Sequence, residues 1–155
     1  MIIALENAKY ELINFKENIL ELGNALRINE LKVEAEELEK LTFEPDFWSN
    51  QENSTKTLQK IKQIKSKIEA YESLSSRLED AIVMAEMAIE ENDESLTDEI
   101  LEEQKSIFAE EEKQRIQVLL SGEYDKNNAI ISFHPGAGGT EAQDWALMLY
   151  RLYTR

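Results

Sequence analysis

The first forty residues carry apolar side chains at alternating steps of three and four, the spacing of one face of an α-helix. These positions are Leu5, Ala8, Leu12, Phe15, Ile19, Leu22 and Leu26 in a first helix, and Leu31, Ala35 and Leu38 in a second. Gly23 and Asn24 predict the end of the first helix. Asn29 predicts the N-cap of the second, because its side chain can accept a free backbone amide. The second helix should end before Pro45, since proline disfavours helical geometry in the residue ahead of it.

A proline and two aromatic residues stand between the second helix and the next apolar stripe. Pro45, Asp46, Phe47 and Trp48 predict a structural corner in which both rings fold back and fill the space between the helices. Asn50 should begin a third helix that runs to about residue 92. Its roughly heptad stripe consists of Leu58, Ile61, Ile68, Tyr71, Leu78, Ile82, Ala85 and Ile89. At ~1.5 Å per residue this helix would be about 60 Å long, so we expect other helices to pack along it.

A polar segment from Asn92 to Ser95 predicts the end of the third helix. Ser95, followed by Asp98 three residues later, resembles a capping box with aspartate in place of the usual glutamate, and predicts a fourth helix. The apolar positions of that helix are Leu96, Ile100, Leu101, Ile107, Phe108, Ile116, Val118, Leu119 and Leu120. Three consecutive glutamates at 110–112 interrupt them, so we expect the middle of this helix to be solvated.

The helical pattern gives way after Ser121. Residues 129–134 predict a strand, residues 135–139 are rich in glycine, and a last helix should begin at Thr140, capped with the help of Gln143. We therefore expect residues 1–121 to form a helical bundle and residues 122–155 to begin a second, incomplete domain. The predicted fold class is mainly α. It is an elongated antiparallel helical bundle or coiled-coil arm of about four helices, followed by the first strand and helix of an incomplete α/β domain.

The composition excludes several classes of chemistry. The 155 residues hold no cysteine, which excludes disulfides, thiolate metal sites and cysteine nucleophiles, and the single histidine, His134, has no histidine partner for a metal site. A formal charge of −15 disfavours direct binding to phosphate backbones. No run approaches the ~20 apolar residues of a membrane span, and the N-terminus lacks a secretory signal, so we expect a cytoplasmic protein without a membrane partner.

The glycine-rich segment lies between a predicted strand and a predicted helix, where backbone amides and the positive helix end can hold an anion. A Walker A loop requires Gly-Lys-Ser/Thr, whereas here Gly138 and Gly139 are followed by Thr140 and Glu141. The third glycine of a dinucleotide fingerprint would also fall at Glu141. A tight turn with close packing is the favoured interpretation, and nucleotide binding is an alternative. One face of the last helix favours core packing and consists of Trp145, Met148, Leu149 and Leu152.

Several strings of residues resemble a known family. The start of the second domain in the bacterial peptide chain release factor 2 family is closely similar to Ser121-Gly122-Glu123-Tyr124-Asp125 followed by Gly136, Ala137, Gly138, Gly139, Thr140, Glu141, Ala142, Gln143, Asp144 and Trp145. The corner at Pro45–Trp48 and the ending from Tyr150 to Arg155 look like that family in the same order. The resemblance therefore spans most of the chain, and the run from Thr140 to Trp145 resembles factor 2 rather than factor 1.

The resemblance implies a cytoplasmic translation termination factor that recognises UAA and UGA codons on the ribosome and triggers hydrolysis of peptidyl-tRNA. The family's codon-reading Ser-Pro-Phe and its Gly-Gly-Gln tripeptide are absent from these residues. This chain by itself is therefore predicted not to be an enzyme, and we assign it no catalytic residue, cofactor, metal or small molecule.

The family's helical first domain implies a docking role for this chain. Its implied partners are the ribosome at the stalk-base region, ribosomal proteins and the class II release-factor GTPase. Contacts with the mRNA stop codon and the peptidyl-transferase centre would belong to domains outside these residues. A self-associating coiled-coil interaction protein is the alternative, because long helices with heptad-like stripes also form homodimers.

Overall fold

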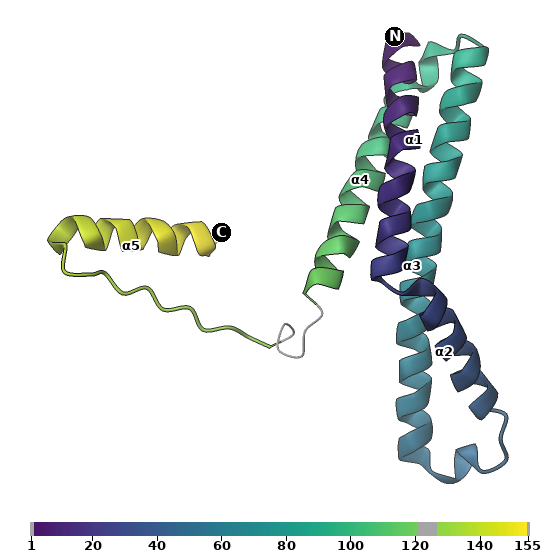
Figure 1. The fold of residues 1–155 in the computed structure, drawn as a ribbon, viewed down its shortest axis with the longest axis horizontal. Helices are drawn as coiled ribbons and strands as arrows, with labels where there is room; N and C mark the ends of the chain where they lie inside the picture. Colours follow the sequence, from purple (N-terminus) through teal and green to yellow (C-terminus); the bar gives the residue numbers. More distant parts are fainter. Residues whose placement is uncertain (1, 121–126, 155) are drawn as a thin grey trace. The chain divides into compact units, whose positions relative to one another are not determined.

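The chain divides into two units, Met1–Ser121 and Gly122–Arg155, in a computed structural model that describes residues 2–120 and 127–154 (Figure 1). The described part of the first unit contains the helices α1 (Ile2–Ala25), α2 (Ile28–Leu41), α3 (Gln51–Glu90) and α4 (Thr97–Leu119), with short 3-10 turns η1 (Phe47–Ser49) and η2 (Glu94–Leu96). Within this unit α1 and α4 lie along one half of α3, and α2 lies along the other half (Figure 1). The prediction of a mainly α fold with helices packed along the third is confirmed.

Three apolar clusters hold the helices of this unit, the helical arm, against α3. The largest joins α1, α3 and α4 through Leu12, Ile19, Leu22, Leu74, Leu78, Ala81, Ile82 and Ile107. A second cluster of Leu5, Ala8, Ala85, Ala88 and Ile100 joins the same three helices nearer the start of α1. The third, between α2 and α3, has the buried residues Ala35, Ile64 and Ile68, with the partly buried Leu31 and Leu38 packed against them. The α2 half of the arm therefore has much the smaller core.

Ion pairs supplement this small core between α2 and α3. Lys32 pairs with Glu72 at 2.5 Å, Lys60 pairs with Glu34 at 2.5 Å, and Lys65 pairs with Glu39. The Glu39 carboxylate also raises the pKa of Lys65, first through a hydrogen bond and then through its charge. All of these side chains are partly exposed, so each pair contributes little free energy by itself and is weakened by salt.

The first helix ends at Ala25, one residue past the predicted stop at Gly23 and Asn24, but Gly23 is not the residue that ends it. Gly23 is buried against α3, and a Cβ atom built on it would stand 2.5 Å from the Tyr71 hydroxyl oxygen. The glycine thus permits a close approach of two helices and does not end one. The turn falls at the next residues, where Arg27 has a φ of 54° and precedes α2.

Local capping also differs from the prediction at two helix starts. Asn29 lies inside α2, and Arg27 in the cap position makes no side-chain capping bond. Before α4, Asp93 accepts a hydrogen bond from the Ser95 amide at 2.9 Å, so the predicted capping box of Ser95 with Asp98 is wrong. The Asp93 side chain thus bonds the backbone amide two residues on, a turn that aspartate commonly forms.

The third helix starts where the sequence predicts, and the second ends where it predicts. Asn50 caps α3 through its side-chain oxygen, which accepts a hydrogen bond from the Asn53 amide at 3.2 Å. α2 ends at Leu41, ahead of Pro45, and the next residue, Thr42, donates from its hydroxyl to the Glu39 carbonyl at 2.7 Å. None of the helices in the described ranges is long and apolar enough to cross a membrane.

The described part of the second unit consists of an irregular segment and the helix α5 (Gly139–Tyr153). The strand predicted for residues 129–134 is wrong, because residues 128–136 have neither strand nor helix. A strand requires a neighbouring strand to bond its backbone groups, and none is present in the described part of the chain. Instead, the Phe133 ring packs on α5, with centroids 5.9 Å from the Tyr153 ring and 6.1 Å from the Tyr150 ring.

Candidate functional site

The predicted corner at Pro45–Trp48 is tied to α3 by a serine. Ser54 is buried in the first turns of α3, and its hydroxyl lies 2.8 Å from the Asn50 carbonyl oxygen and 2.5 Å from the Phe47 carbonyl oxygen. The rings of Phe47 and Trp48 meet edge to face, with centroids 5.0 Å apart. These contacts fix the chain direction between α2 and α3 and hold the two aromatic rings together.

The aromatic side chains at this corner are largely exposed. Trp48 is 63% exposed, and the neighbouring Phe43 is 85% exposed, while Phe47 is half-buried. The prediction that both rings fill the corner is therefore wrong for Trp48. Among the described residues of the first unit, 2–120, α2 and α3 form this end of the arm, because α1 and α4 pack along the other half of α3 (Figure 1). The segment between α2 and α3 therefore has two exposed aromatic side chains, Phe43 and Trp48, which are together called the exposed aromatic surface.

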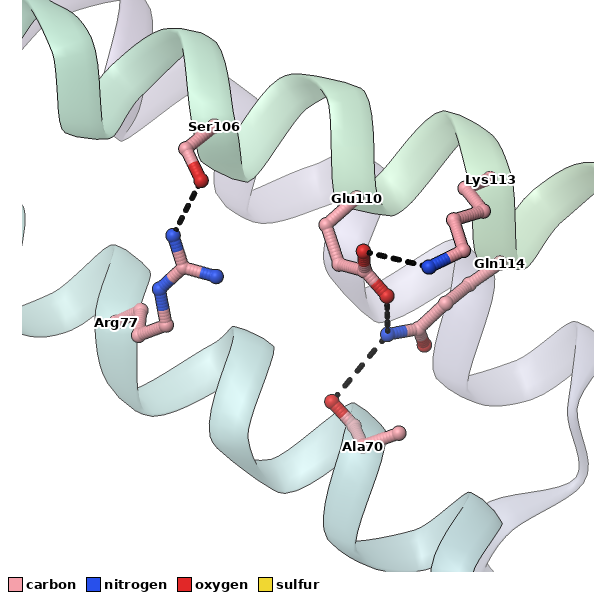
Figure 2. Close-up of polar contacts among 6 residues, drawn as sticks. All are labelled: Ala70, Arg77, Ser106, Glu110, Lys113 and Gln114. Carbon is pink, nitrogen blue, oxygen red and sulfur yellow. Dashed lines mark hydrogen bonds and ion pairs between the residues drawn. The ribbon is translucent and has the colours of Figure 1, made fainter.

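A row of polar contacts joins α3 to α4 farther along the arm, and Figure 2 shows it in close-up. Arg77 of α3 donates to the Ser106 hydroxyl at 2.7 Å and to the Glu103 carboxylate at 2.7 Å. The Glu103 bond raises the already high pKa of Arg77, so the guanidinium stays charged. About two turns of α3 earlier, the Gln114 amide of α4 donates to the Ala70 carbonyl at 3.3 Å.

The glutamate run on α4 is not uniformly solvated, contrary to the prediction. Glu111 is only 5% exposed, and its Oε1 has no hydrogen-bond donor among the described residues. Burial raises the pKa of Glu111, against an opposing effect of Arg115, whose guanidinium lies 3.8 Å away. The carboxyls of Glu112 and Glu21 raise it further. Glu111 is thus a buried carboxylate with one oxygen, Oε1, that accepts no hydrogen bond from the described residues.

These inward polar positions have a signal in the sequence that the apolar stripe alone does not show. Ile100, Gln104, Ile107, Glu111 and Gln114 are all buried and recur at alternating steps of four and three. The same helix face therefore continues from apolar into polar residues. This face of α4 lies against α1 at Gln104, because the Gln104 side-chain amide donates a hydrogen bond to the Glu11 carboxylate at 2.6 Å.

The glycine loop is less closely packed than its sequence predicts. Gly136 has no heavy atom within 4 Å of a built Cβ, whereas a Cβ on Gly138 would stand 3.0 Å from the Ala142 side chain. Helix α5 begins at Gly139, with φ +64°, rather than at Thr140, and no side chain caps it. This left-handed φ requires glycine at position 139, because an L-residue is strained there. The expected cap by Thr140 and Gln143 is therefore wrong.

The motif residues that follow the loop lie on an exposed helix. Glu141, Gln143, Asp144 and Trp145 are exposed, and Ala142 is half-buried. Trp145, Met148 and Leu152 are all more than half exposed, so the expected core packing of this face is wrong within the described residues. The Phe133 ring of the irregular segment instead contacts α5 at Tyr150 and Tyr153.

The described residues 2–120 and 127–154 include no group of three or more histidine, cysteine, aspartate or glutamate side chains placed to hold a metal ion. His134 is exposed, on the irregular segment before α5. The candidate functional features therefore lie in the first unit. They are the helical arm itself, the exposed aromatic surface and the row of polar contacts between α3 and α4.

Comparison with known sequences identifies the family. The sequence profile described as "PCRF domain" matches residues 31–155. The chain belongs to the PCRF domain family. This PCRF domain chain is 40% identical over 155 residues, its whole length, to a protein named peptide chain release factor 2 from Clostridium perfringens (strain SM101 / Type A), of which it covers 42%.

Further relatives of this PCRF domain chain carry the same name. It is 40% identical over 134 residues to peptide chain release factor 2 of Sulfurovum sp. (strain NBC37-1), covering 86% of this chain and 37% of the relative. It is 36% identical over 151 residues to the Staphylococcus saprophyticus protein, covering 97% of this chain and 40% of the relative. The chain thus spans about two fifths of the length of the curated relatives it matches, and corresponds to their N-terminal portion.

Proposed function

We propose that this PCRF domain chain is the N-terminal part of a cytoplasmic translation termination factor that acts at UAA and UGA codons on the ribosome. The observation that carries the proposal is the 40% identity over the entire chain to a protein named peptide chain release factor 2. The match covers both units, including the corner at Pro45–Trp48 and the motif of residues 136–145. In this proposal residues 1–121 are the family's first domain, and residues 122–155 begin the domain that carries codon recognition.

The proposed role of the helical arm is docking. A three-helix core and a long α3 give it stiffness, and its distal corner presents Phe43 and Trp48 to a partner. The formal charge of −15 favours basic protein surfaces over ribosomal RNA. We assign the partners as ribosomal proteins near the stalk base and the class II release-factor GTPase. Codon reading and peptide release would belong to sequence outside these residues.

A release and binding experiment with this chain tests the docking role. Ribosomes carrying labelled peptidyl-tRNA and a UAA codon in the decoding site are mixed with the chain, and both bound protein and released peptide are measured. We expect binding that weakens as salt rises, because charge attraction is screened, and no stop-dependent release. Stop-dependent release by this chain alone would refute the docking-only role, and binding undiminished by salt would refute the basic-protein partner.

Matched variants sharpen that experiment at the corner. Phe43→Ser with Trp48→Ser removes the exposed aromatic surface, whereas Val83→Ser with Met87→Ser removes two exposed apolar side chains from α3 far from it. We expect the first pair to reduce ribosome binding by about tenfold or more, since buried aromatic anchors dominate interfaces, and the second pair to leave it unchanged. Equal effects of the two pairs would show that the corner has no special role.

A further inference from the structure

Helix α1 carries a second apolar stripe on the side that does not face the core. Ile3 is 73% exposed, Tyr10 68%, Ile13 42% and Leu20 64%. With 100° per residue these side chains share one face, roughly opposite the buried Leu5, Ala8, Leu12 and Ile19. Single exposed apolar residues are common on proteins, but a line of them along most of a helix marks an interaction surface.

Two glutamates complete the pattern of this outer stripe. Glu6 and Glu17 are exposed, and together with the four apolar residues they recur at steps of three and four, which is the spacing of a coiled-coil seam. Among the residues that the structure describes, no lysine or arginine side chain lies within ion-pair distance of Glu6 or Glu17. The neighbouring Lys9 is already paired with Glu86 of α3 at 3.0 Å. The outer stripe is therefore apolar with two unpaired negative charges in its line.

A second copy of the chain fits this stripe poorly. In a parallel pairing in register, Glu6 faces Glu6 and Glu17 faces Glu17 of the other copy. In an antiparallel pairing that superposes the stripes, Glu6 faces Glu17. Either arrangement sets like charges together in a seam that excludes water, which disfavours the pairing.

We propose that the outer stripe of α1, made of Ile3, Glu6, Tyr10, Ile13, Glu17 and Leu20, docks a basic amphipathic helix of a partner protein. The partner would place apolar side chains against the four apolar residues. It would also place lysine or arginine against Glu6 and Glu17, at the same spacing along its own helix. A helix laid along an apolar stripe is a recurring mode of recognition, and the opposed charges set its register. This inference goes beyond the termination role and does not depend on it.

A charge-swap experiment with synthetic helical peptides tests the proposal. The Lys probe is a labelled 21-residue amphipathic peptide whose seam is leucine apart from two lysines at the spacing of Glu6 and Glu17. The Glu probe has glutamate at those two positions. Fluorescence anisotropy measures the affinity of each for the natural chain, for the double variant Glu6→Lys, Glu17→Lys, and for a matched control, Glu36→Lys, Glu37→Lys, at exposed positions on α2.

The natural chain and the control should bind the Lys probe at least about tenfold more tightly than the Glu probe, and the Glu6/Glu17 variant should reverse this preference. Each double variant changes the formal charge of −15 by +4, so both chains stay acidic. Non-specific attraction would keep the Lys preference in all three proteins, and that result would overturn the proposal. A second test removes the apolar contacts with Tyr10→Ser and Leu20→Ser. Equal affinity of this variant and the natural chain for the Lys probe would show that the stripe does not bind the helix. Sedimentation of the natural chain as a dimer and of this variant as a monomer would show that the stripe binds a second copy of the chain instead of a basic partner helix.

Discussion

Replacing Gly23 with alanine tests the packing of α1 on α3. A Cβ at this position would stand 2.5 Å from the Tyr71 hydroxyl oxygen and 2.7 Å from its Cζ, whereas ordinary contacts between heavy atoms are about 3.5–4.0 Å. The Tyr71 ring must therefore move by about 1 Å, and overpacking of this kind costs about 1–3 kcal/mol. Alanine offsets part of the cost, because it is favoured over glycine in a helix by up to about 1 kcal/mol.

The assay is urea unfolding of four proteins that form a double-mutant cycle. In the natural background we expect Gly23→Ala to lower the free energy of unfolding by about 1–2 kcal/mol. In a Tyr71→Leu background, where the ring is gone, the same change should raise it by up to about 1 kcal/mol. Asn24→Ala, at an exposed position one residue on, controls for helix propensity. If Gly23→Ala had the same sign in both backgrounds, the close approach to Tyr71 would not be the reason for the glycine.

Two further predictions concern the charges of the arm. Burial raises the folded-state pKa of Glu111, so its contribution to stability is full below its ordinary pKa and is lost as pH rises through the folded pKa. Glu111→Gln should therefore raise the melting temperature at pH 7, and the difference from the natural chain should shrink as pH falls; a difference independent of pH would contradict this cause. Lys60→Glu should weaken α2 packing by up to about 1 kcal/mol, and adding Glu34→Lys should restore it. The hydrogen-exchange rates of the α2 backbone amides measure this loss of packing. The control variant Lys56→Glu, which breaks an ion pair within α3, should leave those exchange rates unchanged.

The helices of the arm are predictable from sequence because their apolar residues recur at helical spacing over many turns. Proline at 45 and asparagine at 50 mark local boundaries that depend on backbone chemistry alone, and the structure confirms both. Gly23 is different, because its reason lies in Tyr71, a residue far along the chain. Local rules interpret such a glycine as a helix end, so this error follows from a tertiary contact that no local pattern contains.

The candidate surfaces depend even more on tertiary context. Trp48 is a good core residue by type, yet it is exposed at the end of the arm where, within residues 2–120, α2 and α3 pack without α1 or α4. Glu111 belongs to a charged run that resembles a solvated face, yet the heptad from Ile100 to Gln114 directs it inward. Residues 129–134 have the composition of a strand, but a strand requires a partner, and the described residues provide none.

The most direct test of the termination assignment is codon-dependent release by the complete gene product that contains this chain. Ribosomes loaded with labelled peptidyl-tRNA present UAA, UGA, UAG or a sense codon in the decoding site, and released peptide is measured for each. We expect release at UAA and UGA at least about a hundredfold above that at UAG and sense codons, which is a discrimination of about 2.7 kcal/mol. Release at none of the stop codons, or at UAG as efficiently as at UGA, would contradict it.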